Sequence, residues 1–571
     1  MKAIYVIPLL LFLVSCIDVL DKKPLDEFSE TDVWSDPYMV ELVVNEAYDG
    51  IETWVTGGMA PSSMVDDVFS NFNWSNERTV THGLLNADNS ENVSMIYNKG
   101  DEGRWAFYYK KIRSINQFFM KIDNVPTEDL EFIDRMKGEM YFLRAYFYSE
   151  LVNFYGGVPI LNQVYDVNSQ DYNVEKSSYN DCVNYIAEQL DSSIALLPYY
   201  YSAENLGRAT KGTAMALKAQ ELLYAASPLY NNGSYNDAKL LEAKSASEAL
   251  IYLQDDGGQQ MYSLYSPNDY RDIFLDHDNS EVIFAKYVND DQFVDRENTL
   301  SRDLGPNSIH GYSAYNPLQQ LVDAFEVVDN QDDPTQSVVP ATYENSQRNV
   351  ISSSLYDDQN PYVLRDPRFY ADLLFDGAVY KNTNTIETYI GGKDSPQGNI
   401  EAWNASKSGY LVRKFTSENE AVFVNVKENI MWILYRLSEL YLNEAEILNE
   451  LGTTDAQGHD AAYYINMIRQ RACVNMPAYS SVDREIIRHE RQVELCFEGN
   501  RYYDVRRWQI YDQVLGIPAL GIQIEKLNDG TKTYQIDTVD NLINFDSRIY
   551  YLPIPSSEIQ KDPTMGQSIG W

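Results

Sequence analysis

Residues 207–229, GRATKGTAMALKAQELLYAASPL, carry the helical pattern from which the fold class follows. Five residues of this stretch and its continuation recur at i, i+3, i+4, i+7 and i+11: Ala219, Leu222, Leu223, Ala226 and Tyr230. This spacing places them on one face of a helix. The small alanines on that face let a second helix approach closely. The stretch therefore predicts a helix over residues 211–230 that packs against a neighbouring helix.

Similar patterns predict further helices in both halves of the chain. In the N-terminal half they cover residues 37–54, 103–122, 129–154 and 177–197. In the C-terminal half an apolar stripe consists of Leu434, Leu437, Tyr441, Ala445 and Leu448. A turn containing Gly452 follows, and then helices near 461–472 and 483–498. Paired helices with alanine at the contacts resemble tetratricopeptide hairpins, although no regular period can be assigned. The predicted fold is mostly α, a scaffold of helical pairs.

The region between these helical blocks has a different composition. Residues 255–421 are rich in Asn, Asp, Ser, Gly, Pro and Tyr, and they contain short strand-like runs at 281–288 and 409–415. Long irregular insertions on a rigid scaffold usually carry function. We therefore expect the ligand-binding loops of the protein to lie largely in this region.

The first residues of the chain have the pattern of a bacterial lipoprotein signal. After Lys2, an apolar run over residues 4–14 leads to Leu13-Val14-Ser15-Cys16, which matches a lipobox. The run is too short for a membrane span, which needs about 20 apolar residues. The alternative is an ordinary secretory signal with a chance cysteine. The lipobox predicts cleavage before Cys16 and a lipid on that residue, so that the mature chain is soluble and tethered to a membrane outside the cytoplasm.

These patterns divide the chain into four predicted parts. The signal peptide covers residues 1–15 and the lipidated tether residues 16–36. An N-terminal helical region covers residues 37–254, and a C-terminal region with the loop insertions covers residues 255–571.

The charge of the chain limits its partners. It has 45 basic and 85 acidic residues, a net charge of −40. This balance argues against nucleic acid as a partner and against electrostatic docking on anionic lipid. The 45 tyrosines and 8 tryptophans suit wet interfaces and flat ligands, although aromatic content alone identifies no ligand.

Motifs for catalysis and metal binding are not found in the sequence. The five histidines form no HExxH motif, and neither a Gly-x-Ser-x-Gly elbow nor a phosphate-binding loop occurs. The four cysteines have no CxxC spacing. Asp66 and Asp67 are adjacent, whereas the two carboxylates of a glycosidase usually come from separate elements. We expect no catalytic residue, no metal and no cofactor.

Four side chains are candidates for ligand contact. Trp74 lies in the polar loop 71–76, NFNWSN, and Asp67 precedes that loop. Tyr97 lies shortly before a predicted helix, and Arg368 follows Asp-Pro. Aromatic rings stack on the flat apolar faces of ligands, while ligand hydroxyl groups need carboxylate acceptors or planar donors. The structural alternatives are a loop anchor for Trp74, a helix staple for Tyr97, a turn for Asp67 and an ion pair for Arg368.

A charged motif near the C-terminus has helical spacing. Its members are Glu490, Arg491, Glu494, Glu498 and Arg501. Acidic residues three or four positions from an arginine pair along a helix. We interpret the motif as a structural tie between this helix and the body of the protein, in preference to a catalytic carboxylate pair.

Four segments of the chain are informative when they are taken together: GRATKG at 207–212 with LLYAASPL at 222–229; RAYF at 144–147 with YGGVPI at 155–160; the motif from Glu490 to Trp508; and LPIP at 552–555 with Glu558-Ile559. They resemble the SusD/RagB family of outer-membrane nutrient-binding lipoproteins of Bacteroidetes. The resemblance covers essentially the whole mature chain. Only the last turn, QSIGW at 567–571, departs from the usual ending of the family.

The resemblance implies a tetratricopeptide-like fold and a non-enzymatic function. A protein of this kind captures an oligosaccharide or polysaccharide at the cell surface and delivers it to a SusC-like TonB-dependent transporter. It is anchored by lipid in the outer membrane and faces the extracellular side. The alternatives are a surface glycoside hydrolase and a peptide-binding or adhesive surface lipoprotein. No motif identifies the glycan.

Overall fold

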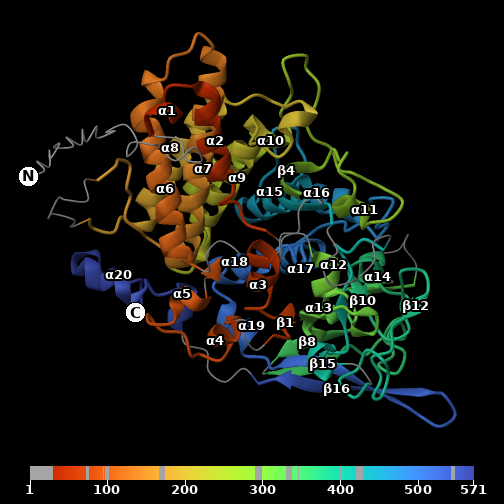
Figure 1. The fold of residues 1–571 in the computed structure, drawn as a ribbon. Helices are drawn as coiled ribbons and strands as arrows, with labels where there is room; N and C mark the ends of the chain where they lie inside the picture. Colours follow the sequence, from red (N-terminus) through yellow and green to blue (C-terminus); the bar gives the residue numbers. More distant parts are fainter. Residues whose placement is uncertain are drawn as a thin grey trace, which may run out of the picture.

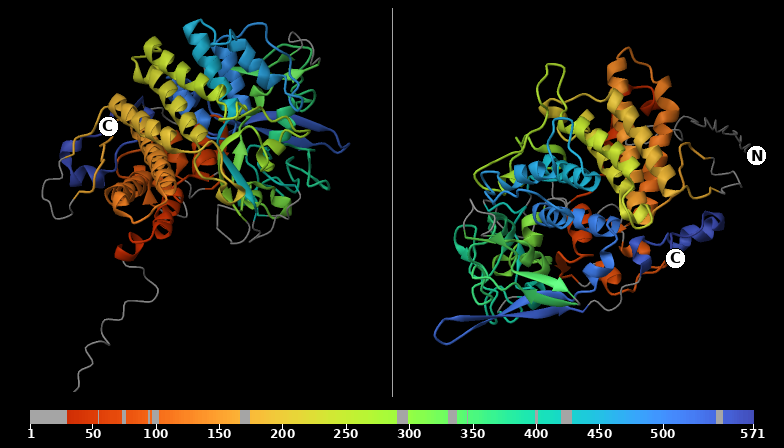
Figure 2. Two further views of the ribbon diagram at one scale, coloured as in Figure 1. Left: turned by 90° about the horizontal axis from the view of Figure 1, so that it is seen from above. Right: turned by 180° about the vertical axis from the view of Figure 1, so that it is seen from behind.

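The computed structural model describes residues 30–53, 55–72, 76–93, 95–96, 102–165, 174–289, 299–329, 337–344, 346–398, 401–418, 428–541 and 547–571. Figure 1 shows a helical half and a half built from short strands and loops, and Figure 2 shows the same two halves side by side from above and from behind. The expectation of a mostly α protein with irregular insertions is confirmed.

The N-terminal helices pack side by side, coloured red to yellow in Figure 1. The long ones are α2 (Pro37–Tyr48), α6 (Arg104–Lys121), α7 (Leu130–Tyr155), α8 (Tyr179–Leu196), α9 (Lys211–Ala226) and α10 (Asp237–Ile251). Shorter helices in this half are α1 (Glu30–Val33), α3 (Ala60–Ser62), α4 (Glu77–Thr81) and α5 (Ser90–Val93).

Polar side chains at the N-caps explain where these helices begin. The Asp129 carboxylate accepts a hydrogen bond from the backbone N–H of Phe132 at 3.0 Å and starts α7. At α9, the hydroxyl groups of Thr210 and Thr213 accept from each other's backbone N–H, which forms a capping box. Such caps satisfy N–H groups that have no partner within the helix.

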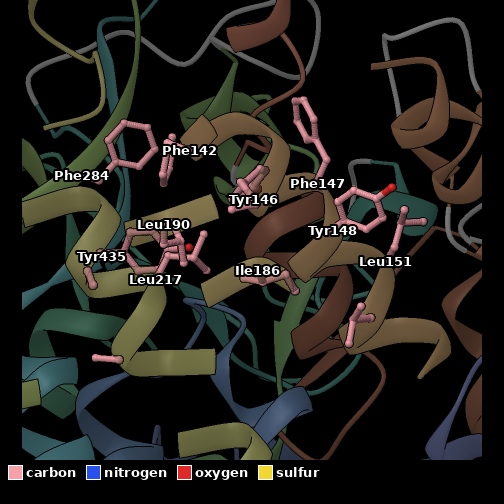
Figure 3. Packing of buried hydrophobic residues seen from close by; sticks show 14 of the residues in the cluster. Phe142, Tyr146, Phe147, Tyr148, Leu151, Ile186, Leu190, Leu217, Phe284 and Tyr435 are labelled. Carbon is pink, nitrogen blue, oxygen red and sulfur yellow. The ribbon is translucent and has the colours of Figure 1, made fainter. Parts of the chain in front are cut away.

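The apolar face predicted for α9 lies in the core. Ala219, Leu223 and Ala226 are buried, and α9 contacts α8, α10 and a later helix, α15 (Leu437–Leu451). Figure 3 shows part of this core, in which the Phe142 ring from α7 meets Phe284 edge to face at a centroid distance of 5.4 Å. The alanines therefore let α9 occupy the centre of the scaffold.

A second group of helices closes the scaffold from the C-terminal half. After α15 come α16 (Ala461–Arg469), α17 (Arg484–Glu494), α18 (Asn500–Arg507), α19 (Tyr511–Leu515) and α20 (Ser556–Lys561). Gly452 ends α15 in the left-handed conformation, with φ 60°. One predicted boundary is wrong: Leu434 belongs to strand β14 (Ile430–Arg436), which pairs antiparallel with β4 (Val282–Val288). A buried strand is apolar on both faces, so its pattern merges with that of the following helix.

The loop-rich half contains two-stranded sheets and short helices. Its remaining strands are β5 (Tyr315–Pro317), β6 (Val327–Val328), β7 (Ser337–Val338), β8 (Ala341–Glu344), β9 (Gln347–Val350), β10 (Leu373–Leu374), β11 (Val379–Tyr380), β12 (Asn384–Thr385), β13 (Leu411–Val412), β15 (Ala519–Lys526) and β16 (Lys532–Asp540). Its helices are α11 (Asp272–Leu275), α12 (Leu300–Leu304), α13 (Gln319–Ala324) and α14 (Pro367–Asp372). Strands β1 (Val68–Ser70), β2 (Met95–Ile96) and β3 (Glu102–Gly103) come from the N-terminal half.

The charged motif ties α17 to the body, as the sequence predicts. Glu490 Oε1 accepts from Arg368 Nη1 at 2.6 Å, and Glu494 Oε1 accepts from Arg436 Nη1 at 2.8 Å. Glu498 Oε2 accepts from Arg436 Nε at 2.8 Å. The side chains of these groups are at most 7% exposed, so each charge is compensated inside the protein.

Candidate functional site

A short sheet brings the Asn-rich loop after β1 next to the loop before β5. β1 and β5 are antiparallel, with Phe69 opposite Asn316. The backbone N–H of Asn71 continues the ladder by donating to Ala314 O at 2.8 Å. Segments that are more than 200 residues apart in the sequence (71 and 314) thus lie against each other.

Three aromatic side chains from three segments form a surface cluster, here called the aromatic platform: Phe72, Tyr312 and Trp403. Their ring centroids are 6.4 Å apart for Phe72–Tyr312, 6.5 Å for Phe72–Trp403 and 6.0 Å for Tyr312–Trp403. Phe72 is buried at 6% exposure, Tyr312 is half-buried, and Trp403 is 53% exposed. The buried Phe72 ring therefore supports a large ring that faces solvent.

The turn that carries Tyr312 is held by its own backbone. Tyr312 N–H donates to Arg302 O at 2.8 Å, and Ser313 N–H donates to Gly305 O at 3.0 Å. Gly311 lies directly against Gly305: a Cβ atom on Gly311 would be 2.2 Å from the Gly305 carbonyl carbon and oxygen. Only glycine permits this approach, which fixes the backbone of the turn from which the Tyr312 side chain projects.

Three buried asparagines hold the turn that carries Trp403. Each donates a side-chain N–H to a backbone carbonyl: Asn71 to Ala405 at 3.1 Å, Asn307 to Glu401 at 3.1 Å, and Asn404 to Gly311 at 3.3 Å. Together they connect the segments that carry the three rings. The platform is therefore preorganised, which reduces the conformational entropy lost when a ligand binds.

The polar groups around the platform suit a neutral hydroxylated ligand or the C–H face of a ring. The indole Nε1 of Trp403 donates to Glu401 Oε2 at 2.8 Å, and the Glu401 side chain is exposed. The Arg302 guanidinium lies 5.1 Å from the Tyr312 ring centroid and pairs with Asp303 Oδ1 at 2.7 Å. An aromatic face with a nearby hydrogen-bond acceptor can bind such a ligand by stacking and hydrogen bonding. Binding of this kind requires no nucleophilic side chain.

Asp67 is an interior residue in the structure. It has 0% exposure, and its Oδ1 accepts from Gln492 Nε2 of α17 at 3.0 Å. Burial, and secondarily the neighbouring Asp66, raise the pKa of Asp67 to about 7. Asp66 in turn pairs with Arg501 at 3.0 Å. Asp67 therefore lies in the interior next to α17 and is not presented to solvent as a hydroxyl acceptor.

Arg368 is also placed in the interior, at 0% exposure. Its guanidinium donates to Asp366 Oδ2 at 2.8 Å, Glu490 Oε1 at 2.6 Å and Glu494 Oε2 at 3.0 Å. These carboxylates accept hydrogen bonds from the N–H groups that Arg368 would need for contact with a ligand. The structure thus assigns Arg368 the ion-pair role that was the alternative to ligand binding. Asp67 and Arg368 both contact α17, and neither joins the aromatic platform.

The other predicted site residues, Cys16, Trp74 and Tyr97, lie outside the described residues. Sequence reasoning missed Tyr312 and Trp403. A sequence signal for Trp403 was present. The segment EAWNAS at 401–406 places a tryptophan among polar residues, as NFNWSN does at 71–76.

Two features of the described residues bear on other functions. They contain no cluster of three or more His, Cys, Asp or Glu side chains arranged to hold a metal ion. Among the helices of this described part, none has the length and apolar character required to cross a membrane.

The protein has a helical scaffold and a loop-rich half that presents a fixed aromatic surface. These features are those of a mostly helical binding protein of tetratricopeptide-like architecture. The chain belongs to the SusD family, whose model matches residues 280–571. A second model, described as "Starch-binding associating with outer membrane", matches residues 18–223. The family resemblance seen in the sequence is confirmed.

Individual relatives align along nearly the whole chain. SusD-like protein P38 of Formosa agariphila is 23% identical over 90% of this chain and 92% of its own length. The crystal structure of a SusD-like protein from Bacteroides fragilis has a TM-score of 0.76 and 28% identity, and it covers 96% of this chain and 100% of its own. A SusD-like carbohydrate binding protein of the same species has a TM-score of 0.73 and 23% identity, with 94% and 100% covered.

Proposed function

We propose that this protein is a glycan-binding lipoprotein of the outer cell surface that delivers oligosaccharide to a SusC-like TonB-dependent transporter. In this proposal a lipid on Cys16 anchors the chain in the outer membrane. The protein binds its ligand without chemical change.

The observation that carries the proposal is the aromatic platform. Trp403 is a large ring with 53% exposure on a turn that three asparagines hold in place. A monomeric protein gains nothing in stability from such exposure, whereas a pyranose ring can stack on it. A structural relative is named as a carbohydrate binding protein, which supports the same ligand class here.

Trp74 remains a proposed contributor to this site. It follows Phe72 of the platform by two residues in the sequence. Stacking on an aromatic ring contributes about 1–3 kcal/mol for a nucleic-acid base, and we take the same scale for a sugar. Trp74→Ala should therefore weaken glycan binding by about tenfold.

Binding without catalysis is tested with a panel of polysaccharides. Native gels that contain each polysaccharide should retard the purified protein in at least one case. The retained glycan is then incubated with the protein for a day and analysed for reducing ends. We expect no increase. Time-dependent product release would identify a glycoside hydrolase instead, and retention by none of the glycans would contradict the proposed ligand class.

The transporter partner is tested by purification from native membranes in mild detergent. We expect a SusC-like barrel to copurify with the protein. Isolation of the protein alone, together with normal glycan uptake in a strain that lacks it, would contradict the proposed delivery step.

A further inference from the structure

A cleft lies beside the hairpin of β15 and β16, where two other segments attach to β15. The backbone N–H of Ile522 donates to Ser408 O at 2.8 Å, and the backbone N–H of Ile390 donates to Ile524 O at 2.8 Å. The cleft against these segments has a volume of about 100 Å³, several times the space that one water molecule requires. We call it the hairpin cleft, and it is lined by residues of the 388–397 loop, the 406–409 segment, 521–524 and 537–539.

Two glycines hold the 406–409 side of the hairpin cleft against β15. A Cβ atom on Gly521 would lie 2.7 Å from the Cα and carbonyl oxygen of Ser408. A Cβ atom on Gly409, whose φ is 84°, would lie 2.6 Å from Ile522 O. Only glycine permits so close an approach of two backbones. This side of the cleft is therefore fixed relative to the hairpin.

The side chains around the hairpin cleft offer apolar contact and hydrogen bonds without an excess of charge. Ile390 is apolar and exposed, and the exposed amides of Gln397 and Gln523 supply both donors and acceptors. Among the described residues, one cationic and one anionic side chain line the cleft, Lys407 and Asp537. Such a lining suits an uncharged ligand with hydroxyl groups and an apolar face.

The side chain of Thr388 points to a partner from outside the chain. Thr388 lines the hairpin cleft and is 8% exposed. Its backbone N–H donates to Asp376 Oδ1 at 3.1 Å, whereas its hydroxyl group has no hydrogen-bond partner among the described residues. Buried hydroxyl groups nearly always have a partner, because burial removes the hydrogen bonds that they form with water. A hydroxyl group of a ligand in the cleft would supply that partner.

The hairpin cleft is close to the aromatic platform along the chain. Ser406 lines the cleft and follows Trp403 by three residues, so their Cα atoms are at most about 11 Å apart. Ala405 lies between them, and the Asn71 amide donates to its carbonyl oxygen at 3.1 Å. The segment that connects the platform to the cleft is therefore held in place by the same amide that holds the Trp403 turn.

We infer that the hairpin cleft is a second subsite, which binds an uncharged sugar unit of the glycan that stacks on Trp403. The apolar face of this unit packs on Ile390. Its hydroxyl groups form hydrogen bonds with the amides of Gln397 and Gln523 and with the hydroxyl of Thr388. This inference rests on the proposed glycan-binding function, and it adds that the ligand is an uncharged oligosaccharide held at two places.

Titration calorimetry with four neutral probes tests the inference: maltohexaose, cellohexaose, laminarihexaose and xylohexaose. We expect at least one of them to bind. Thr388→Val and Gln523→Ala should each weaken its binding about fivefold, because each variant removes hydrogen bonds to the sugar. The control is Gln457→Ala, at an exposed glutamine in the turn between α15 and α16, which lie far from β15 and β16 in Figure 1. The control should bind as the wild type does.

The stability of Thr388→Val distinguishes a ligand contact from a structural role. The variant keeps the shape of the side chain and removes a buried hydroxyl that has no partner in the described part of the chain. Its denaturation midpoint should therefore equal or exceed that of the wild type while its affinity falls. A loss of stability together with affinity would assign the hydroxyl a structural role and would count against the inference.

A crystal structure of the complex with the hexaose that binds locates the subsite directly. We expect a sugar hydroxyl within hydrogen-bond distance of Thr388 Oγ1. A bound hexaose that leaves the hairpin cleft without a sugar unit would overturn the inference. Tighter binding of an oligogalacturonate than of every neutral hexaose would contradict the uncharged ligand class.

The outcomes separate the inference from the function on which it rests. Wild-type affinity of both Thr388→Val and Gln523→Ala, together with weakened binding by Trp403→Ala, would overturn the inference and leave glycan binding at the platform intact. Binding of none of the four hexaoses and retention by none of the polysaccharide gels would overturn the proposed function and the inference together.

Discussion

Glu494 accepts hydrogen bonds from three guanidinium groups inside the protein. Its Oε1 accepts from Arg436 and Arg471, both at 2.8 Å, and its Oε2 accepts from Arg368 at 3.0 Å. Although burial opposes ionisation, these three cations hold the pKa of Glu494 well below its usual range. The carboxylate therefore stays charged in the fold, and it balances charge contributed by three other segments.

Replacement of this carboxylate should strongly destabilise the protein. Glu494→Gln leaves buried guanidinium charge uncompensated, and loss of one partner of a buried ion pair costs about 3–5 kcal/mol. Chemical denaturation at neutral pH measures the loss. Glu485→Gln on the same helix is the control, because the Glu485 side chain is 78% exposed and its pair with Arg488 contributes at most about 1 kcal/mol. Equal stability of both variants would contradict the structural role of Glu494.

Glu221 shows the opposite behaviour, because no cation in the described part of the chain pairs with it. Its Oε1 accepts from Ser149 Oγ at 2.7 Å and from Asn153 Nδ2 at 2.8 Å. Burial raises the pKa of Glu221 to about 7. In the fold the group holds its proton up to that pH, whereas in the unfolded chain it ionises near its ordinary value of about 4.3. Its contribution to stability therefore decreases as pH rises from about 4 to about 7.

Glu221→Gln removes this titration. Relative to the wild type, the variant should gain up to about 3 kcal/mol in unfolding free energy between pH 4.5 and pH 8. Denaturant midpoints at both pH values measure the difference. An identical difference between variant and wild type at the two pH values would show that Glu221 is ionised in the fold.

At the scale of elements, the turns around the platform determine the position of the platform rings more directly than the helices do. The 401–405 turn contains one short 3-10 helix, Ala402–Asn404, and its position depends on side-chain amide hydrogen bonds to and from other segments. Asn307 is buried, and its Nδ2 donates to Glu401 O at 3.1 Å. Loss of this bond lets the turn sample arrangements in which Trp403 leaves the platform.

Asn307→Ala should therefore weaken glycan binding more than it weakens the fold. One hydrogen bond contributes about 1 kcal/mol, which corresponds to about fivefold in affinity. Titration with the glycan retained in the panel measures the change. The control is Asn349→Ala in β9, an exposed residue whose amide donates to the nearby Gln347 O at 3.4 Å. An unchanged affinity for the Asn307 variant would show that this amide does not position Trp403.

The sequence predicted the elements that depend on local signals. The helix over 211–230 appears as α9 followed by a short 3-10 turn at Pro228–Tyr230, because the Thr210 cap and the apolar face are local. The hairpin of β15 and β16 was missed, although its alternation and the LNDG segment at 527–530 are typical of a hairpin. The sequence left two roles open for Arg368, ligand contact and an ion pair, and it could not decide between them because the partners Glu490 and Glu494 follow 122 and 126 residues later.

At the scale of the whole molecule, the helical half and the loop-rich half contribute differently to stability and to the proposed binding site. The helical half supplies a large continuous core, and the loop-rich half carries the Tyr312 and Trp403 rings of the aromatic platform. A net charge of −40 keeps such a protein soluble and disfavours nonspecific contact with anionic surfaces. Under the proposed function, attachment to the membrane depends on the lipid on Cys16 and on the transporter partner.

Cys16→Ala should release the protein from the membrane. The lipobox Leu13-Val14-Ser15-Cys16 offers one cysteine for acylation. Fractionation of cells grown with a labelled fatty acid measures both attachment and location. We expect the wild type to carry the label in the outer-membrane fraction and the variant to lack it. A variant that still carries the label in that fraction would refute lipidation at Cys16.

The role of the aromatic platform as the glycan site is tested by the affinity of Trp403→Ala for the glycan retained in the panel. We expect binding to weaken at least tenfold with an unchanged melting temperature, because the ring is 53% exposed and contributes little to the core. Tyr200→Ala, at a ring with 69% exposure on the helical half, is the control and should bind as the wild type does. Full affinity of the Trp403 variant would show that the glycan binds elsewhere on the protein.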